Sequence, residues 1–156
     1  MKQNLQINDL VLSSNFGLGK IVGFETVGDA NQNFVVIESL EKKIKVLAPI
    51  TENLNFRKLS AADELKERLN NLKNLVSKKE FESKKDRITY FKGQSNKQDL
   101  NSIFETIVEL RDLEDRGSVE NKIYENLVDN IKLELTTVTD MDKDDASQYV
   151  DNSLKH

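Results

Sequence analysis

The spacing of hydrophobic residues changes partway along the chain and divides it into two parts. In the first part, apolar residues alternate with polar ones over short runs, which is typical of β-strands with one buried face. The expected strands cover residues 10–12, 21–24, 34–38, 43–47 and 56–59. In the second part, apolar residues recur three or four positions apart, the spacing of one face of an α-helix. The pattern predicts an α+β protein with a β domain over residues 1–60 and a helical domain over residues 61–156.

A glycine turn marks the start of the β domain. Gly17 and Gly19 bracket Leu18 at a position that needs unusual backbone angles, so the strands on either side are expected to form a hairpin. The only proline, Pro49, ends the last long strand. Four or five antiparallel strands in about 55 residues correspond to a small antiparallel Tudor-like or SH3-like β-barrel. We therefore expect the first domain to be a binding module.

The helical domain is expected to be a compact bundle of four or five helices. Ser60 is a candidate N-cap for the first helix, Gly117 is expected to end a later helix, and Ser118 is expected to cap the helix after it. The apolar face of the first helix comprises Leu65, Leu69, Leu72, Leu75 and Val76. The cleanest amphipathic pattern comprises Val119, Ile123, Leu127, Ile131, Leu135 and Val138. Further apolar faces lie within residues 103–110 and 146–154.

Charge is distributed unevenly along the chain. The net charge is −4, but residues 78–97 hold seven basic and three acidic side chains, a local excess of four positive charges. This segment could hold phosphate groups through Lys84, Lys85, Arg87 and Lys92, or it could be an ordinary solvated helix face. An acidic protein with a single basic segment is not expected to bind polyanions in general.

The chain offers little for catalysis, and we expect it not to be an enzyme. It contains no cysteine, and its single histidine is the last residue, His156. Residues 16–20 resemble part of a phosphate-binding loop, but Ile21 follows where that loop needs Ser or Thr. The aspartates of residues 140–151 have the spacing of a calcium loop without its glycine and glutamate, so an acidic helix cap is the simpler interpretation. No cofactor and no metal are expected.

Composition and hydropathy favour a cytoplasmic protein. Hydrophobic residues make up 37% of the chain and charged residues 32%, which indicates a modest core under a solvated surface. No basic and apolar leader and no apolar run long enough to span a membrane are visible. We expect a monomer that does not bind membranes.

Several short motifs occur in the order found in a known family. The family opens with a pattern like GDxVVxPxxGxGxI, to which residues 8–21 are similar, with Asn8 in place of the glycine and a residue near Ser14 in place of the proline. Further similar segments are IKVLAP at 44–49, FRKL at 56–59, RDLEDR at 111–116 and IKLEL at 131–135. Together they resemble the CarD/CdnL family of bacterial RNA polymerase-binding transcription regulators, whose amino-terminal module is shared with transcription-repair coupling factor.

The resemblance implies a Tudor-like domain that docks on the β subunit of RNA polymerase and a helical domain that contacts promoter DNA. Such proteins act on initiation by stabilising the open promoter complex. The implied polymerase-binding residues are Val27, Ile44, Lys45, Val46 and Leu47. The implied DNA-binding residues are Lys84, Lys85, Arg87, Tyr90 and Lys92. The DNA contact is expected to be weak and not sequence-specific, and the protein to associate with the nucleoid through polymerase.

One departure from the family concerns an aromatic wedge. The family commonly inserts a tryptophan of the helical domain into the minor groove, and this chain contains no tryptophan. The corresponding place falls near Ser83 or Lys84, and Phe81, Tyr90 or Phe91 could replace the missing side chain. Because an apolar wedge holds an unstacked base step open, its loss weakens the case for bubble stabilisation.

Two alternatives stay open. The strand at residues 44–47 could be an exposed edge that adds to the sheet of a partner, or its lysines could discourage such pairing. The whole protein could also be a protein–protein adaptor that uses the β-barrel and makes no contact with nucleic acid. Asp112 and Asp115 lie at helical spacing and are interpreted as surface residues or as partners for Arg111 and Arg116.

Overall fold

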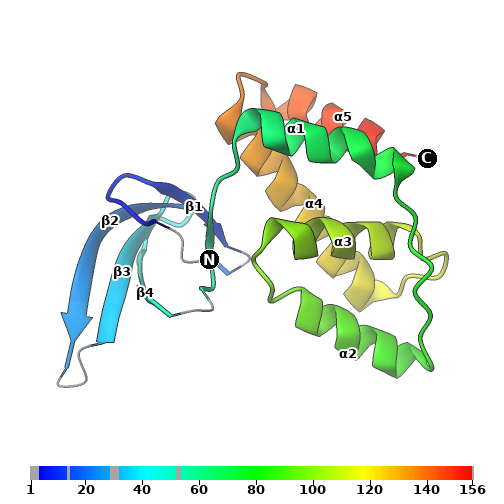
Figure 1. The fold of residues 1–156 in the computed structure, drawn as a ribbon, viewed down its shortest axis with the longest axis horizontal. Helices are drawn as coiled ribbons and strands as arrows, with labels where there is room; N and C mark the ends of the chain where they lie inside the picture. The colour runs from blue at the N-terminus through cyan, green and yellow to red at the C-terminus, as the bar shows by residue number, and fades with distance from the viewer. Residues whose placement is uncertain (1–3, 14, 29–31, 52–53, 156) are drawn as a thin grey trace. The chain divides into compact units, whose positions relative to one another are not determined.

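The protein has a mixed α+β structure (Figure 1). The computed structural model describes residues 4–13, 15–28, 32–51 and 54–155. Within these residues the chain forms five β-strands and five α-helices. It divides into two compact units, Met1–Leu59, here called the sheet unit, and Ser60–His156, here called the helical unit. No helix in the described residues is both long enough and apolar enough to cross a membrane.

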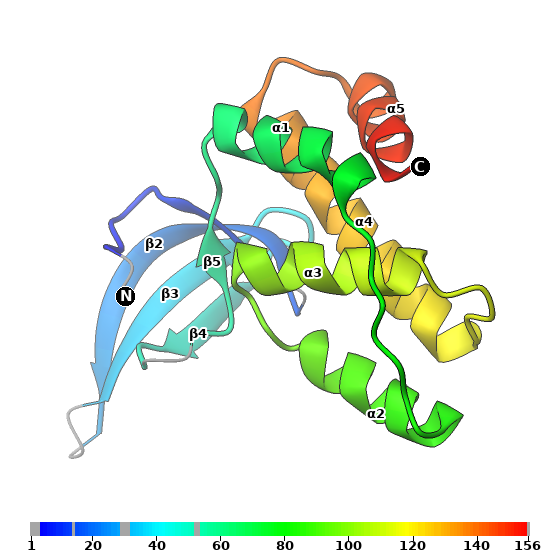
Figure 2. The ribbon, with the colours of Figure 1, turned by 45° about the vertical axis from the view of Figure 1, so that its right-hand side comes forward.

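The sheet unit contains one antiparallel sheet in the order β4-β3-β2-β1-β5 (Figure 2). The strands are β1 (Leu10–Ser13), β2 (Gly17–Val27), β3 (Gln32–Ser39), β4 (Lys45–Pro49) and β5 (Arg57–Lys58). A strand is present at each of the five expected places. β2 and β3 are longer than the apolar runs that predicted them, β4 begins two residues later than expected, and β5 has only two residues. In the described residues β4 pairs with β3 and β5 pairs with β1, so these two strands form the edges of the sheet.

The backbone conformation at the start of β2 requires a glycine. Gly17 has a φ of 73°, which favours glycine. A Cβ atom added at Gly19 would lie 2.6 Å from Cγ2 of Ile37, so the packing of β2 on β3 depends on the missing side chain. Asn8 also has a positive φ, of 78°, and asparagine is one of the few other residues that tolerate this conformation. The prediction of unusual backbone angles is confirmed at Gly17 alone, because Leu18 and Gly19 lie within β2 and pair with β1.

The inner face of the sheet forms the core of the sheet unit. Five strand residues are fully buried there, and Phe16 and Phe56, which directly precede β2 and β5, are buried with them. The five are Val11, Ile21, Val35, Ile37 and Ala48. Val46 is partly buried and packs against this core, whereas Lys45 and Leu47 of the same strand are exposed. The expected strand start at Lys43 is wrong, because Lys43 adopts a φ of 54° in the turn that precedes β4.

The helical unit contains five α-helices and one 3₁₀ turn. They are α1 (Ala62–Asn71), η1 (Leu72–Asn74), α2 (Lys84–Gln94), α3 (Leu100–Arg111), α4 (Ser118–Val138) and α5 (Lys143–Leu154). The core that they share includes Leu65, Leu69, Leu72, Phe91, Phe104, Ile107, Val108, Leu110, Leu127, Val128, Ile131, Leu135, Ala146 and Val150. The amphipathic pattern predicted for residues 119–138 is confirmed in α4, although Val119 itself is 38% exposed.

Several predicted helix ends differ in the structure. Ala61 is the N-cap of α1, and the N–H of Ser60 instead donates to the Glu134 carboxylate over 2.7 Å. α3 already ends at Arg111, and Gly117 is the N-cap of α4, so Ser118 is its first helical residue. The acidic cap of the last helix is confirmed, because the carboxylate of Asp142 accepts the N–H of Asp145.

The first helix is shorter than its apolar pattern predicted. α1 ends at Asn71, and beyond η1 the backbone of Leu75 is extended. Leu75 and Val76 are therefore 46% and 64% exposed, and the prediction that they belong to the core is wrong. A continuous apolar spacing cannot show where the chain leaves the helical conformation.

Candidate functional site

The free edge of β4 is the first candidate surface. The carbonyl of Ile44 accepts the N–H of Ser39 over 2.8 Å, and the N–H of Ile50 donates to Asn33 over 2.9 Å. Antiparallel strands direct the backbone groups of alternate residues to the same neighbour. The even-numbered residues of β4 therefore bond to β3, and the backbone groups of Lys45, Leu47 and Pro49 point away from it.

Three of the predicted polymerase-binding side chains are exposed at this edge. Ile44 and Leu47 are 50% and 51% exposed, and Lys45 is exposed between them. Val46 packs against the core of the sheet unit, so its side chain is not available at the edge. The backbone of Val27 lies in β2, but its side chain is outside the part of the chain that the structure describes.

Pro49 and the residue after it complete this edge. Proline has no N–H, so the open donors of the edge are limited to Lys45 and Leu47. Ile50, which the sequence analysis did not single out, is 37% exposed and adds a third apolar side chain. The signal that could have found it was the isoleucine directly after the proline that ends the strand.

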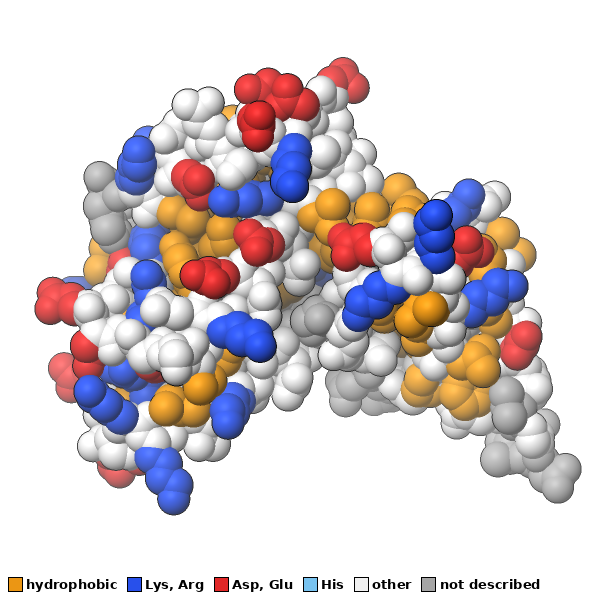
Figure 3. All heavy atoms as spheres, turned by 180° about the vertical axis from the view of Figure 1, so that it is seen from behind, with side chains coloured by type: hydrophobic (Ala, Val, Ile, Leu, Met, Phe, Trp, Pro, Cys, Tyr) orange, Lys and Arg blue, Asp and Glu red, His pale blue; other side chains and the backbone are white. Residues whose placement is uncertain are grey.

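The basic segment of the helical unit is centred on α2. Lys84, Lys85 and Lys92 have exposed side chains there. Lys85, Thr89 and Lys92 are spaced four and three residues apart, so they share one face of the helix. On the side drawn in Figure 3, Lys and Arg gather towards the lower end of the helical unit, where Figure 1 places α2. These three lysines remain candidates for phosphate contacts.

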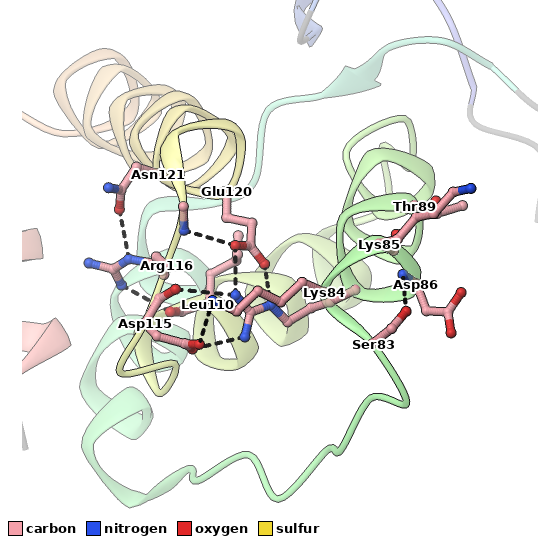
Figure 4. A network of polar contacts seen from close by, with 12 residues as sticks. Ser83, Lys84, Lys85, Asp86, Thr89, Leu110, Asp115, Arg116, Glu120 and Asn121 are labelled. Atoms are coloured by element: carbon pink, nitrogen blue, oxygen red, sulfur yellow. Dashed lines mark hydrogen bonds and ion pairs between the residues drawn. The ribbon is translucent and has the colours of Figure 1, made fainter.

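Arg87 does not belong to this exposed surface, because it bonds to Asp115 and Glu120, the two carboxylates labelled in Figure 4. It is only 8% exposed, and its guanidinium donates to both carboxylate oxygens of Glu120, the Nη2 bond measuring 2.9 Å. Nη1 also donates to Asp115 over 2.8 Å. The role of phosphate contact that the resemblance implied for Arg87 does not fit this position, because all of its branches are already bonded within the helical unit.

The ion pairs around Arg87 change the ionisation of its partners. The hydrogen bond with Glu120 raises the pKa of the Arg87 guanidinium above its usual value. Burial alone would raise the pKa of Glu120, but hydrogen bonds from Arg87 and from the Gly117 N–H outweigh it and hold that pKa below its usual value. The hydrogen bond from Arg87 also lowers the pKa of Asp115. The carboxylates thus stay charged, and α2 stays fastened to the start of α4.

Tyr90 is also engaged inside the helical unit. Its hydroxyl lies 2.8 Å from each oxygen of Glu109, and Gln94 donates to that hydroxyl over 3.2 Å. Burial, reinforced by the hydrogen bond with Glu109, raises the pKa of Tyr90, and burial likewise raises the pKa of Glu109. Lys79 lies 3.9 Å from the centre of the Tyr90 ring. Tyr90 is therefore held as a packed residue rather than as a free contact for DNA.

The three aromatic residues proposed as a substitute wedge form one cluster. The ring centres of Phe81, Tyr90 and Phe91 lie 5.1–5.6 Å apart. Phe91 is fully buried, and the other two are partly buried against the same core. In this arrangement none of the three presents a fully exposed ring for insertion between base pairs.

The first two residues of the RDLEDR segment fasten the end of α3 to residues 72–77. Arg111 donates to the carbonyl oxygens of Leu72 and Leu75, and Asp112 accepts the N–H of Ser77. The predicted pair of Arg111 and Asp112 is present, with a distance of 2.9 Å. Asp115 is exposed, as one of the two interpretations expected, but its arginine partner is Arg87 and not Arg116.

Arg116 has different partners. It donates to the Leu110 carbonyl and to Asn121, and it lies over the ring of Tyr124. In the described residues no group of acidic or histidine side chains is arranged to hold a metal ion. No model of a known protein family matches the chain, and no curated protein matches it closely.

Proposed function

We propose that this protein binds the β subunit of RNA polymerase through the sheet unit and modulates transcription initiation. The observation that carries the proposal is the edge of β4. Its outward backbone groups have no partner among the described residues, and the side chains of Ile44 and Leu47 are exposed beside them. Such an edge can accept a strand from a partner, with backbone hydrogen bonds giving affinity and side chains giving selectivity. The proposal includes a Tudor-like barrel for the sheet unit.

The helical unit would then act as a tethered second contact. Docking on polymerase raises the effective concentration of the helical unit at the promoter, so a few weak phosphate contacts suffice. We assign these contacts to Lys84, Lys85 and Lys92, and we leave out Arg87 and Tyr90 because both are engaged within the unit. The protein works in this way in the cytoplasm, associated with the nucleoid through polymerase.

Leu47→Glu is expected to weaken polymerase binding by about tenfold or more. The carboxylate would be buried without a partner against the docked strand, which costs more than the 1.4 kcal/mol that corresponds to a tenfold change. Leu47 is 51% exposed, so the fold is expected to tolerate the change. The measurement is the affinity of the full-length variant for purified bacterial RNA polymerase.

Ile7→Glu is the matched control for this prediction. Ile7 is 56% exposed in the same unit but precedes β1, away from β4 in the strand order. Wild-type affinity in Ile7→Glu and reduced affinity in Leu47→Glu support docking at β4. Equal affinities in both variants would remove β4 from the interface. Val46→Glu is unsuitable, because Val46 packs on the core.

A second candidate function is a protein–protein adaptor without nucleic-acid contact. The observation in its favour is that Arg87 and Tyr90 are bonded within the helical unit, which leaves fewer groups for phosphate. Under the DNA-contact proposal, log affinity for duplex DNA falls with log salt concentration by about 0.9 per phosphate contacted. The two functions therefore differ in a measurable slope.

Lys85→Glu combined with Lys92→Glu is expected to lower both duplex affinity and its salt slope. Both lysines are exposed on α2, so the change removes phosphate contacts without disturbing the core. Lys122→Glu with Lys143→Glu is the control of equal charge, on exposed positions of α4 and α5. Fluorescence anisotropy of labelled duplex across salt concentrations measures both quantities. Absence of binding by the wild type at low salt would favour the adaptor.

A further inference from the structure

The segment that joins η1 to α2 crosses the surface of the helical unit without forming helix or strand. We call residues 75–82 the strap. Figures 1 and 2 show it as a drawn-out stretch between the two helices. Leu75 at its start has extended angles, φ −98° and ψ 136°, and Phe81 near its end packs into the aromatic cluster. The strap therefore holds Leu75 in an extended conformation, and the side chains of Leu75 and Val76 are both exposed.

One side of the strap is bound by the end of α3. Arg111 donates to the carbonyl of Leu72 over 2.8 Å and to that of Leu75, and the carboxylate of Asp112 accepts the N–H of Ser77 over 2.8 Å. These two side chains take the place of a neighbouring strand, because they bond to alternate residues of the strap. A backbone held in this way loses little further conformational entropy when a partner binds.

The other side of the strap is open. Among the described residues, the backbone N–H and C=O groups of Val76 and Lys78 make no hydrogen bond. An extended chain directs the backbone groups of consecutive residues to opposite sides, so these groups point away from α3. The ammonium groups of Lys73 and Lys78 are exposed, and neither takes part in an ion pair in the described structure.

We propose that the strap is a docking edge for an extended acidic segment of a partner protein. The segment adds as a β-strand to the backbone groups of Val76 and Lys78 and covers the Val76 side chain. Its carboxylates meet Lys73 and Lys78, and this charge complementarity decides the occupant. Within the strap, Lys78 and Lys79 are followed by Glu80 and Glu82, so the positive charge lies before Glu80. The edge lies in the helical unit and is separate from β4, so the proposal goes beyond polymerase docking.

The test uses the full-length chain and a capped peptide of alternating glutamate and valine. We expect the peptide to shift the amide resonances of Val76 and Lys78 in ¹H–¹⁵N spectra. Val76→Asp is expected to reduce peptide affinity by about tenfold or more, because like charges would then face each other. Val119→Asp is the matched control, since Val119 is an exposed apolar residue on α4 and should leave the affinity unchanged.

A lysine–valine peptide of the same length tests the role of charge. Equal shifts with this basic peptide overturn the proposal, as do shifts confined to β4 or no shifts at millimolar acidic peptide. A third arm titrates duplex DNA. Shifts of Val76 and Lys78 with DNA, in the absence of any effect of the acidic peptide, would assign the strap to nucleic acid and overturn the proposal.

Discussion

Arg87→Ala is expected to lower the free energy of unfolding by about 3–5 kcal/mol, the usual cost of leaving a buried charge without its partner. Glu120 is only 1% exposed, and Arg87 supplies two of the three hydrogen bonds found for its carboxylate. Without Arg87 the carboxylate stays buried, and the fastening of α2 to α4 is lost. Urea denaturation followed by far-ultraviolet circular dichroism measures the loss.

Lys84→Ala is the control, because it removes a neighbouring charge from the same network. The side chain of Lys84 is 77% exposed and lies 3.8 Å from Asp115, so its removal should change stability by no more than about 0.5 kcal/mol. Equal stabilities of Arg87→Ala and wild type would contradict the structural role of Arg87. They would return Arg87 to the candidates for phosphate contact.

The same network predicts a loss of stability in acid. The folded-state pKa of Glu120 lies below its ordinary value, so the unfolded chain binds a proton more readily than the folded one. The contribution of the ionised Glu120 carboxylate to folding stability is complete above the ordinary glutamate pKa of about 4.3. It disappears as the pH falls through the folded-state pKa of Glu120. The difference in free energy of unfolding between the wild type and Arg87→Ala should therefore become smaller in acid. Urea denaturation at several pH values measures it.

Phe91→Ala is expected to cost about 3–5 kcal/mol of stability. Phe91 is fully buried, and its ring packs against Phe81 and Tyr90, so its removal leaves a cavity between α2 and the core of the helical unit. Thermal and urea denaturation measure the cost. The prediction also distinguishes a packed core residue from an aromatic wedge for DNA, because a wedge would have to be free in the unbound protein.

Leu75→Ala is the matched control, because Leu75 is an apolar residue of the same unit that is 46% exposed. Its replacement should cost much less than that of Phe91, because little buried surface is lost. A stable Phe91→Ala variant with reduced DNA binding would contradict the packing account and support Phe91 as the wedge.

The periodic patterns predicted most of the elements correctly. The strands β1–β4 and the long helix α4 were visible because burial on one face imposes a spacing of two or about 3.6 residues. Gly17 could be interpreted because a positive φ restricts the residue type. These features depend on residues that are close in sequence, so they can be predicted from the sequence alone.

The sequence could not show which polar residues are occupied by distant partners. Arg87 looks like its neighbours Lys84 and Lys85, but its bond to Glu120 joins residues 33 positions apart. The same holds for Ser60 and Glu134, which are 74 positions apart. Such contacts depend on tertiary packing, and helical spacing does not reveal them. For the same reason the basic segment was predicted as one surface, whereas the structure divides it into exposed lysines and a buried arginine.

The edge of β4 could be predicted only in part. The alternating pattern of residues 43–47 indicated a strand, but its position at the edge follows from the strand order. The backbone bonds of Ile44 and Ile50 then decide which residues have open groups. Val46, an apolar residue of the same run, packs against the core and not at the predicted interface, because successive side chains of a strand point to opposite faces of the sheet.

Hydrogen exchange of the full-length protein with and without RNA polymerase decides whether polymerase docks at the edge of β4. We expect polymerase to slow exchange of the Lys45 and Leu47 amides, whose N–H groups point away from β3, and to leave exchange in β5 at the opposite edge unchanged. The amides of β4 that already bond to β3 serve as an internal reference. Unchanged exchange at Lys45 and Leu47 under saturating polymerase would contradict docking at β4.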